Sequence, residues 1–384
     1  EYRADGLDLE RFQDALRHVI ARHDMLRAIV LPGGELQVLD DVPAFEITKT
    51  DMRGKGDEAF EAVRVKVRRE MEAQVFDVSV WPLLDVQAVL GDDGRLSIHI
   101  GVDIIIGDAW SFIILGDELA RYYADTHLAL PPMPITFRDY VTAFEQLRQE
   151  EAHAKARGYW EDRLDTLPGP PVLPFARDPS SIDQPTFERT RLRVEPEIWG
   201  QIKTQAAAHG VTPSAMVLTA YAEALAVHAE DPGFVLNLTL FNRLPLHEAV
   251  NALVGDFTSV TLLEVDAGGA PIFRDLVRRV QERLWSDLDN RTFSGIDVMR
   301  AKTGRQGGQR YHAPMVFTSV FGAEDLVSEV ERQYLPMTLE YREGQTPQAW
   351  IDHMVVEEGG ALLSVWNVVE GIFYDGFVSG LQEV

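Results

Sequence analysis

Apolar residues near the start of the chain recur at the spacing of an amphipathic helix. From position 9 to position 20 they lie mostly three or four residues apart, which would place them on one face of a helix of about four turns. We therefore predict a helix that ends near Arg22. Its apolar positions are Leu9, Phe12, Leu16, Val19 and Ile20.

Between Trp81 and Asp103 the pattern becomes typical of a β-hairpin. A largely apolar run at residues 83–90 is followed by the turn-forming sequence Gly-Asp-Asp-Gly at 91–94. Apolar and polar side chains then alternate, so that residues 96, 98, 100 and 102 would lie on one face of a second strand. Asp103 would end this strand on its polar side.

Other segments carry signals for the start of a helix. Thr136 and Asp139 form a capping-box pattern, which predicts a long helix running toward Trp160. Thr212 followed by Pro213 is typical of an N-cap and the first residue of a helix. Periodicity also predicts strands near residues 187–194 and 234–241 and an amphipathic helix at 273–284.

Six prolines between residues 168 and 185 interrupt all periodicity, as expected of a connection between two folded parts. The length of 384 residues also favours two lobes, because single hydrophobic cores stop growing at about 250–300 residues. Helices alternate with strands in both halves, which predicts an α/β fold. We predict an N-terminal lobe at 1–167, a Pro-rich connection at 168–186 and a C-terminal lobe at 187–384.

Composition and charge narrow the classes of function. The 36 basic and 61 acidic side chains give a formal charge of -25, which would repel the phosphate backbone of a nucleic acid. The absence of cysteine excludes disulfides, Cys-ligated zinc and a Cys nucleophile, and it favours a cytoplasmic location. Apolar runs are too short to cross a membrane, and no histidine spacing indicates a metal site. We therefore predict no nucleic-acid, membrane or metal binding.

The segment 103–111, Asp-Ile-Ile-Ile-Gly-Asp-Ala-Trp-Ser, places two carboxylates around a turn between a strand and a helix. From the residues alone, Asp103 and Asp108 could bind a divalent cation, act as acid and base, or cap the helix. Among these alternatives, the residue pattern favours a structural role.

The same segment resembles the Asp-x4-Asp-x2-Ser signature of heterocyclization domains of non-ribosomal peptide synthetases, with Asp103, Asp108 and Ser111 at its three positions. Ordinary condensation domains carry His-His-x3-Asp-Gly instead, and Ile104 stands where their second histidine would be. A hydrocarbon side chain cannot transfer a proton, so an ordinary condensation or epimerization activity is disfavoured. Residues 22–27 resemble the opening Arg-His-x2-Leu-Arg of the wider condensation superfamily. Segments similar to heterocyclization domains in particular follow in the family's order at 237–243, 254–259, 284–289, 293–295, 314–319 and 345–353.

The resemblance implies a chloramphenicol-acetyltransferase-like architecture, in which two α/β lobes form a V around a central tunnel. Substrates would arrive on the phosphopantetheine arms of upstream and downstream carrier-protein domains, with neighbouring synthetase domains such as an adenylation domain. No permanently bound cofactor is implied. The reaction would join an acyl or peptidyl thioester to carrier-bound Cys, Ser or Thr and then close a thiazoline or oxazoline ring.

The resemblance also assigns roles to single residues. Thr318 and Asp352 match the family's catalytic pair, and Asp352 is a candidate on physical grounds because an Asp on an apolar strand needs a partner or a raised pKa. Asp108 would pair across the lobes with Arg243, joined by Ser111. Four further residues are expected to line the tunnel: Asn237, Asn242, Ser319 and Gln348.

Two alternatives to this function stay open. A non-catalytic module that only docks carrier proteins would predict damaged motifs, whereas the motifs of this chain are intact. An ordinary condensation domain or stand-alone acyltransferase of the same fold would ordinarily retain a histidine where Ile104 lies.

Overall fold

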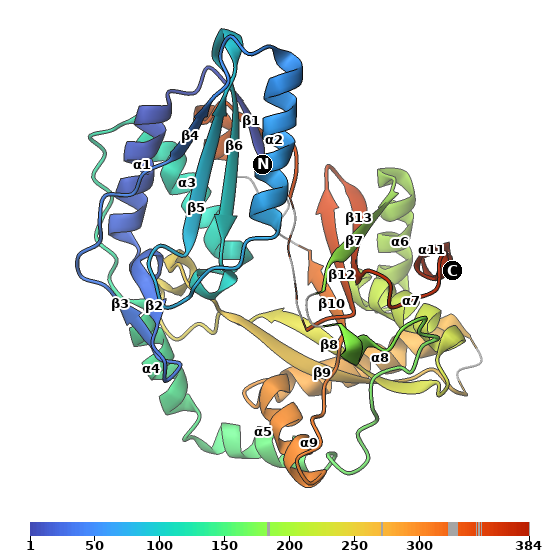
Figure 1. Ribbon diagram of the computed structural model, residues 1–384. Helices are drawn as coiled ribbons and strands as arrows, with labels where there is room; N and C mark the ends of the chain where they lie inside the picture. Colours follow the sequence, from blue (N-terminus) through green and yellow to red (C-terminus); the bar gives the residue numbers. More distant parts are fainter. Residues whose placement is uncertain are drawn as a thin grey trace. The chain divides into compact units, whose positions relative to one another are not determined.

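The computed structural model describes residues 1–182, 185–269, 272–321, 329–342, 344, 346 and 348–383 (Figure 1). The chain forms two compact units, each assembled from three segments. Unit 1 comprises Glu1–Phe144, Arg243–Phe257 and Leu326–Gly344. Unit 2 comprises Glu145–Asn242, Thr258–Asp325 and Gln345–Val384.

This division differs from the predicted lobe boundaries at three segments. Residues 145–167 belong to unit 2, because the fully buried Trp160 packs against Val235 and Leu262 of that unit's sheet. The segment Arg243–Phe257 belongs to unit 1, where Phe257 packs against Tyr140. The segment Leu326–Gly344 also belongs to unit 1, where residues 337–339 pair with residues 2–4. All three differences come from contacts between residues far apart in sequence, which local periodicity does not reveal.

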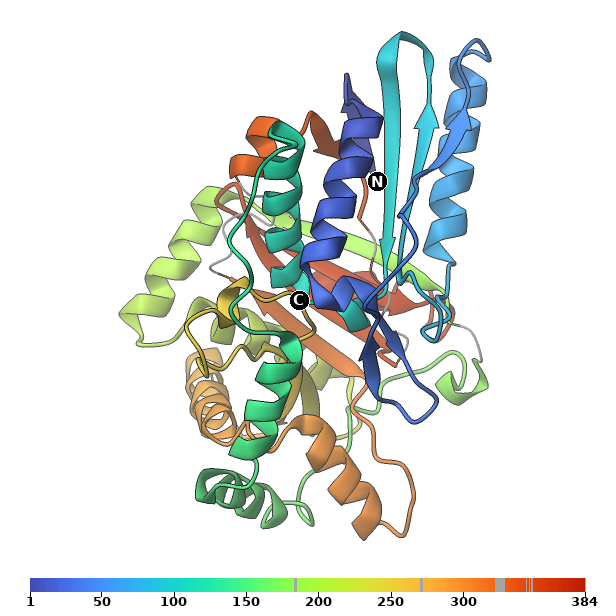
Figure 2. The same cartoon turned by 90° about the vertical axis from the view of Figure 1, so that its left-hand side faces the viewer.

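Unit 1 is a three-layer α/β sandwich. Helices α1 and α3 cover one face of the sheet and lie side by side (Figure 2), while α2 packs on the other face through Phe60 and Val67. The strand order is β11 (Met337–Leu339), β1 (Tyr2–Asp5), β6 (Arg95–Val102), β5 (Leu84–Leu90) and β4 (Thr48–Asp51). The helices are α1 (Leu9–Arg22), α2 (Asp57–Glu72), α3 (Ala109–Ala124), α4 (Phe137–Leu147) and α10 (Glu329–Tyr334), and β2 (Ala28–Val30) pairs with β3 (Leu36–Val38).

Several predicted elements of unit 1 are confirmed. Helix α1 ends at Arg22 and begins after Asp8, whose carboxylate accepts hydrogen bonds from the Glu10 and Arg11 amides. Strands β5 and β6 pair antiparallel as the predicted hairpin. The capping box is present, but the predicted long helix is two helices, α4 and α5 (Glu151–Glu161). The boundary between the units falls between Phe144 and Glu145, within the last turn of α4 and just before this break.

Unit 2 is built on a six-stranded mixed sheet in which β10 runs parallel to both of its neighbours. The strand order is β7 (Phe187–Val194), β13 (Ala361–Val369), β12 (Ile351–Glu358), β10 (Met315–Val320), β8 (Gly233–Phe241) and β9 (Thr258–Asp266). The helices are α5, α6 (Pro196–Ala208), α7 (Pro213–His228), α8 (Phe273–Asp289), α9 (Gly295–Arg305) and α11 (Phe377–Glu383). Single-turn 3₁₀ helices lie at Asp24–Arg27, Asp92–Gly94, Ile104–Ile106, Pro179–Ser181 and Val250–Ala252.

The two faces of this sheet have different surroundings. One face packs against α6, α7 and α8 through Trp199, Leu218 and Leu276, and forms the larger core of the unit. On the other face, α5 and α9 cover the β8–β9 side through Trp160 and Val298. The first face therefore buries the odd-numbered residues of β12, such as Ile351, and the even-numbered ones point to the second face.

Within the described ranges, no single helix is long and apolar enough to span a membrane; the bent pair α6 and α7 passes that test only when the two are combined.

Candidate active site

The predicted signature at 103–111 forms a turn that two aspartates cap. Asp103 follows β6 and accepts a hydrogen bond from the Ile105 amide at 3.0 Å. Asp108 is the N-cap of α3, and its Oδ1 accepts from the amide and the hydroxyl of Ser111 at 2.8 and 2.7 Å. Both aspartates therefore have the capping role that is common for Asp before a helix.

Arg243 completes a buried cluster around Asp108. Its Nη2 donates to Asp108 Oδ1 at 2.6 Å, and the two side chains are 7% and 0% exposed. Its Nη1 donates to the carbonyls of Val250 and Leu253 at 3.1 and 2.9 Å, and the guanidinium lies 3.9 Å from the centre of the Phe257 ring. The predicted ion pair is confirmed by this distance.

The location of the pair corrects one part of the prediction. Arg243 was expected to reach Asp108 from the second lobe, but both residues belong to unit 1. The chain leaves β8 at Phe241 and then packs residues 243–257 against α4 and the start of α3. The pair therefore fixes a returning segment within unit 1.

Ser111 connects the same cluster to Gly255. Its Oγ accepts a hydrogen bond from the Gly255 amide at 3.1 Å and lies 2.9 Å from the Gly255 carbonyl oxygen. A Cβ at Gly255 would come within 2.3 Å of the Phe137 ring, so this close approach requires glycine. The residues of the signature thus hold backbone segments together, which agrees with the structural role predicted for them.

A second group of the predicted residues lies on the sheet of unit 2. Thr318 is on β10 and Asp352 is on the adjacent parallel strand β12, with Val316 opposite Asp352 and Thr318 opposite Met354. Paired residues of neighbouring strands point to the same face. Thr318 and Asp352 therefore share the face that the larger core does not use, and both are partly exposed there.

Asp352 is a carboxyl group that is largely shielded from solvent. Its Oδ2 accepts a hydrogen bond from the Thr346 hydroxyl at 2.7 Å, and its buried Oδ1 accepts none from any described residue. Burial raises the pKa of Asp352 above its ordinary value, while the hydrogen bond from Thr346 and the charge of Arg189 act in the opposite direction. A raised pKa is what a proton donor near neutral pH requires.

Thr318 and Asp352 share a face, but their polar atoms bond to other partners. The Thr318 hydroxyl donates to Thr239 Oγ1 at 2.9 Å. The two residues are offset by one strand and two positions, which corresponds to roughly 8 Å between their Cα atoms. The sheet thus brings two residues that lie 34 positions apart in sequence onto neighbouring strands of one face.

The four residues expected to line a tunnel occupy different places. Asn237 lies on β8, on the same face as Asp352, and pairs with Val316 of β10. Its buried Oδ1 has no hydrogen bond from the described part of the chain. Ser319 points to the opposite face and bonds to Ser214 at the start of α7. Asn242 is buried just after β8, where its Oδ1 accepts from Arg291 Nε at 3.4 Å, and Gln348 is exposed before β12.

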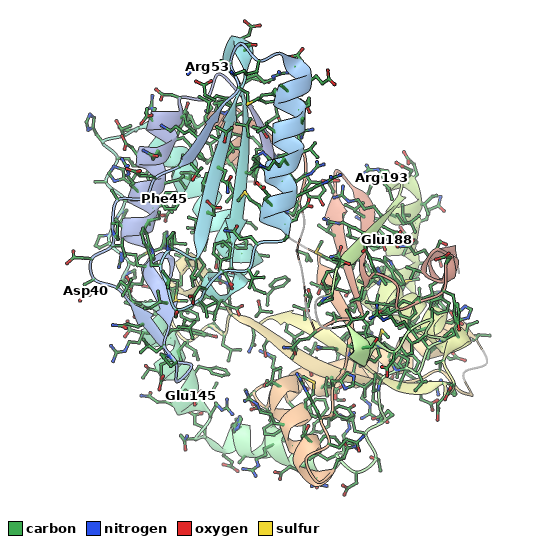
Figure 3. All side chains as sticks on the ribbon, in the orientation of Figure 1. Asp40, Phe45, Arg53, Glu145, Glu188 and Arg193 are labelled. Carbon is green, nitrogen blue, oxygen red and sulfur yellow. The ribbon has the colours of Figure 1, made fainter. Side chains whose placement is uncertain are left out.

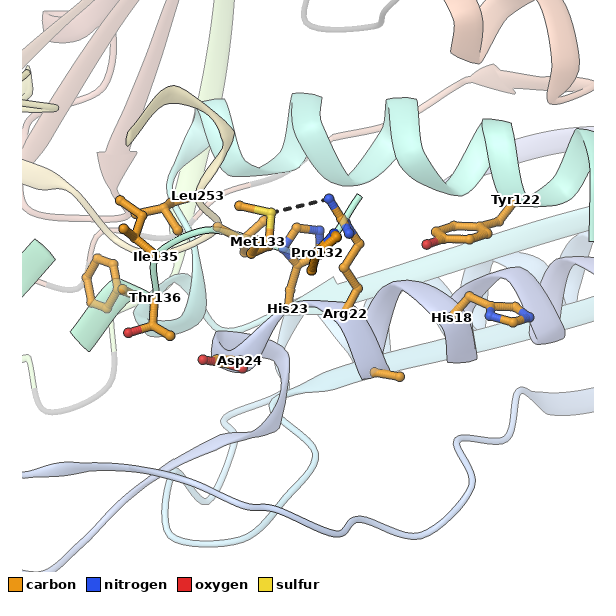
Figure 4. A pocket seen from close by; sticks show the side chains of 13 residues that line it. His18, Arg22, His23, Asp24, Tyr122, Pro132, Met133, Ile135, Thr136 and Leu253 are labelled. Carbon is orange, nitrogen blue, oxygen red and sulfur yellow. Dashed lines mark hydrogen bonds between the residues drawn. The ribbon is translucent and has the colours of Figure 1, made fainter. Parts of the chain in front are cut away.

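Unit 1 has a pocket of about 450 Å³ beside α1 (Figure 4). Its polar walls are paired with one another. Arg22 and His23 both bond to Glu118, at 3.0 and 2.8 Å, and Arg22 also contacts the Met133 sulfur at 3.3 Å. Among the described residues, no three His, Asp or Glu side chains are grouped as they would be around a metal ion.

The motif order and this geometry agree with one known family, whose model, the condensation domain, matches residues 2–349. The chain belongs to the condensation domain family. Pyochelin synthetase PchF from Pseudomonas aeruginosa is 34% identical over 370 residues, which cover 96% of this chain and 20% of PchF. Phenyloxazoline synthase MbtB from Mycobacterium tuberculosis is 32% identical over 387 residues, 99% of this chain and 27% of MbtB. This condensation domain therefore spans only about a quarter of such relatives or less.

A solved structure places the domain more narrowly. The cyclization-docking bidomain of the EpoB synthetase from Sorangium cellulosum aligns with a TM-score of 0.87 at 33% identity, covering 100% of this chain and 77% of that one. The predicted resemblance to heterocyclization domains and the predicted α/β fold are confirmed by this match.

Sequence reasoning missed several residues around Asp352 in this condensation domain. Thr346 donates to its carboxylate, Asn367 lies opposite it on β13, and Arg189 lies opposite Asn367 on β7. Asn367 in the largely apolar run 361–369 was a usable signal. The register of β12, β13 and β7, which brings these residues together, cannot be obtained from a single sequence.

Proposed function

We propose that this domain joins two carrier-bound acyl groups through an amide and then closes the side chain of Cys, Ser or Thr into a thiazoline or oxazoline. The observation that carries the proposal is Asp352. It is a carboxyl group with a pKa raised by burial and a free oxygen, on a partly exposed sheet face beside Thr318. The names of PchF, MbtB and the EpoB bidomain support the same chemistry.

The first stage needs little acid or base assistance. The α-amine of the carrier-bound amino acid attacks the upstream thioester; the C–N bond forms, the C–S bond breaks, and a thiol leaves. Because a thiol is a good leaving group, holding the two reactants together supplies most of the acceleration. Ile104 in place of a histidine is compatible with this stage.

The second stage depends on proton transfer. The thiol or hydroxyl of the new residue adds to the amide carbonyl, and its proton ends on the carbonyl oxygen, giving a hemiaminal. Asp352 then protonates that hydroxyl and water leaves; the nitrogen gives its proton to solvent as the C=N bond forms, and the Asp352 carboxylate takes up a proton from solvent. Hydroxide is a poor leaving group, so a positioned acid contributes about 10²–10⁴-fold.

The substrates follow from the same proposal. Upstream and downstream carrier domains would present acyl groups on phosphopantetheine arms, and an adenylation domain would load the Cys, Ser or Thr. These arms act as substrates that come and go, and the domain keeps no cofactor of its own. A docking module without activity would give no product from loaded carriers, and an ordinary condensation domain would give only linear amide.

The test is a mass-resolved time course with both loaded carriers, which separates linear amide from the product that has lost water. Asp352→Asn keeps the shape of the side chain and removes the acidic proton. We expect it to accumulate linear amide with about 10²-fold less cyclised product, and Thr318→Ala to do so more mildly. Equal loss of both products would assign Asp352 to folding or binding, and normal ring closure would remove it from the mechanism.

Asp287→Asn is the matched control. Asp287 is also a carboxyl group in unit 2 whose pKa is raised by burial, but its Oδ1 already bonds to Arg163 at 2.6 Å and to Tyr159 at 2.7 Å. This substitution should lower stability without changing the ratio of cyclised to linear product.

A further inference from the structure

Asp352 belongs to a row of polar residues that crosses the sheet of unit 2. Strand register places Arg189 on β7 opposite Asn367 on β13, Asn367 opposite Asp352, and Asp352 opposite Val316, which faces Asn237 on β8. Paired residues point to one side, so these groups share a face. The row ends at Arg189, which lies on β7 between Glu188 and Arg193, two residues that Figure 3 labels.

Three acceptor oxygens of this row are unused. Oδ1 of Asp352, of Asn367 and of Asn237 is buried in each case, and none receives a hydrogen bond from a described residue. Asn367 is only 6% exposed. Most buried polar atoms in folded proteins have a partner; the described atoms that lack one are spread over both units, and three of them lie in this row. Three in one row indicate a site that receives hydrogen-bond donors from a bound molecule.

The chemistry of that molecule follows from the atoms. Carboxylate and carboxamide oxygens accept hydrogen bonds from N–H and O–H groups. In the reaction proposed above, the hemiaminal carries one N–H and one O–H on adjacent positions. Neighbouring side chains across a strand pair have Cβ atoms about 5 Å apart, a spacing that lets two oxygens contact two such donors.

We propose that Asn367 is a positioning residue for ring closure: its Oδ1 accepts the N–H of the cyclising intermediate and holds the hydroxyl of that intermediate against Asp352. This inference rests on the proposed function and adds a residue to it. Asn367 does not exchange a proton, and it contributes by orientation. A carboxamide suits this place because a second carboxylate beside Asp352 would compete with it for protons.

The first test removes the acceptor without changing the size of the side chain. Asn367→Leu, assayed with both loaded carriers, should lower the ratio of cyclised to linear product about tenfold, the effect of losing roughly 1.4 kcal/mol of orientation. The total amount of amide formed should change little. The control is Ser364→Ala, because Ser364 is 7% exposed on the same strand but bonds to His353 on the helix-covered face. It should leave the ratio unchanged.

The second test uses a readout that a purely structural residue would not move. Asn367→Asp places a second carboxyl group beside Asp352, and two neighbouring carboxylates resist ionising together. The pH midpoint of ring closure should move up by about one unit or more, whether Asp352 acts as acid or as base, because its own pKa moves up. Asn290→Asp, the same change at the end of α8, should leave the midpoint in place.

Other groups near Asp352 set the baseline of that profile. Arg189 lies in the row, and Arg191 lies two residues further along β7 on the same face. Tyr221 on α7 and His353 lie toward the helix-covered face. Burial lowers the pKa of His353 to about 3, and burial, with the charge of Asp352, raises the pKa of Tyr221. Neither group therefore titrates near neutral pH.

The outcomes separate the two proposals. If folded Asn367→Leu keeps the wild-type product ratio while Asp352→Asn lowers it, Asn367 has no positioning role and the proposed function stands. An unchanged pH midpoint in folded Asn367→Asp would also exclude the positioning role. If Asp352→Asn cyclises normally, the proposed function itself fails, whatever Asn367 does.

Discussion

Asp108 and Asp352 are both shielded carboxyl groups, and the number of donors around each decides what it does. One oxygen of Asp108 receives an amide, a hydroxyl and a guanidinium, all from unit 1. Asp352 receives a single hydroxyl, and in both residues the second carboxyl oxygen accepts no hydrogen bond from a described residue. A carboxylate held by three donors, one of them a buried cation, holds structure together, whereas a carboxyl group whose pKa is raised by burial is suited to proton transfer.

Removing the carboxylate of Asp108 leaves the Arg243 guanidinium buried without its counter-charge. We expect Asp108→Ala to lose about 3–5 kcal/mol of the free energy of unfolding, because breaking a buried pair exposes the desolvation cost of the remaining ion. Urea denaturation followed by circular dichroism measures this. Asp165→Ala, which breaks the exposed pair with Arg305, should change stability by less than about 1 kcal/mol. A fully stable but inactive Asp108→Ala would contradict the structural role.

Single residues were predictable where a short motif carries them. Asp103, Asp108 and Ser111 lie within nine positions, and the partner Arg243 followed from a second motif. Asn367 and Thr346 were not predictable, because their proximity to Asp352 depends on strand register and on a loop that folds back. Register is set by packing over the whole sheet, which a single sequence does not contain.

At the scale of elements, local signals succeeded where one segment decides its own structure. The start of α7 at Thr212 and Pro213 and the hairpin of β5 and β6 are confirmed. The long helix expected after Thr136 is wrong, because residues 137–147 and 151–161 form two helices with cores in different units. The helical pattern continues through the break, so tertiary packing and not propensity decides where α4 ends.

The returning segment at residues 243–257 gives a prediction about packing. Gly255→Ala would place a Cβ 2.3 Å from the Phe137 ring, so ring and backbone must move apart. We expect a loss of about 1–3 kcal/mol, typical of overpacking, seen as a lower melting temperature. Gly304→Ala is the matched control, because its Cβ would meet nothing within 4 Å and it lies in α9. There the same change should raise stability by about 0.5–1 kcal/mol. Equal effects at both sites would contradict the packing argument.

At the scale of the whole molecule, the sequence predicted two α/β parts correctly but not their boundaries. The proline-rich stretch at 168–185 is the strongest local break in the sequence, yet the chain changes units before it, near Glu145. It changes again at Arg243 and Thr258, where no proline cluster or charge run marks the transition. Units assembled from separate segments are defined by contacts between residues far apart in sequence. Composition along the chain therefore does not reveal where each segment begins and ends.

The formal charge of -25 gives a prediction about carrier binding. Carrier domains of this kind are commonly acidic, so long-range repulsion should slow their encounter with this chain at low salt. Raising the ionic strength from about 0.01 M to 0.15 M shortens the Debye length from about 30 Å to about 8 Å. We therefore expect the second-order rate constant with loaded carriers to rise with salt.

The control for this effect is a small uncharged thioester in place of the loaded carrier, whose rate should not depend on salt.

A rate constant that falls as salt rises would also be informative. If the rate with carriers falls as salt rises, attraction by a local basic patch outweighs the net charge, since screening weakens whichever long-range term dominates. Exposed arginines on α8, such as Arg274 and Arg278, would then be the first to reverse. Charge reversal there should remove the salt dependence if that helix docks the carrier, and leave it intact if the arginines only solvate an exposed face.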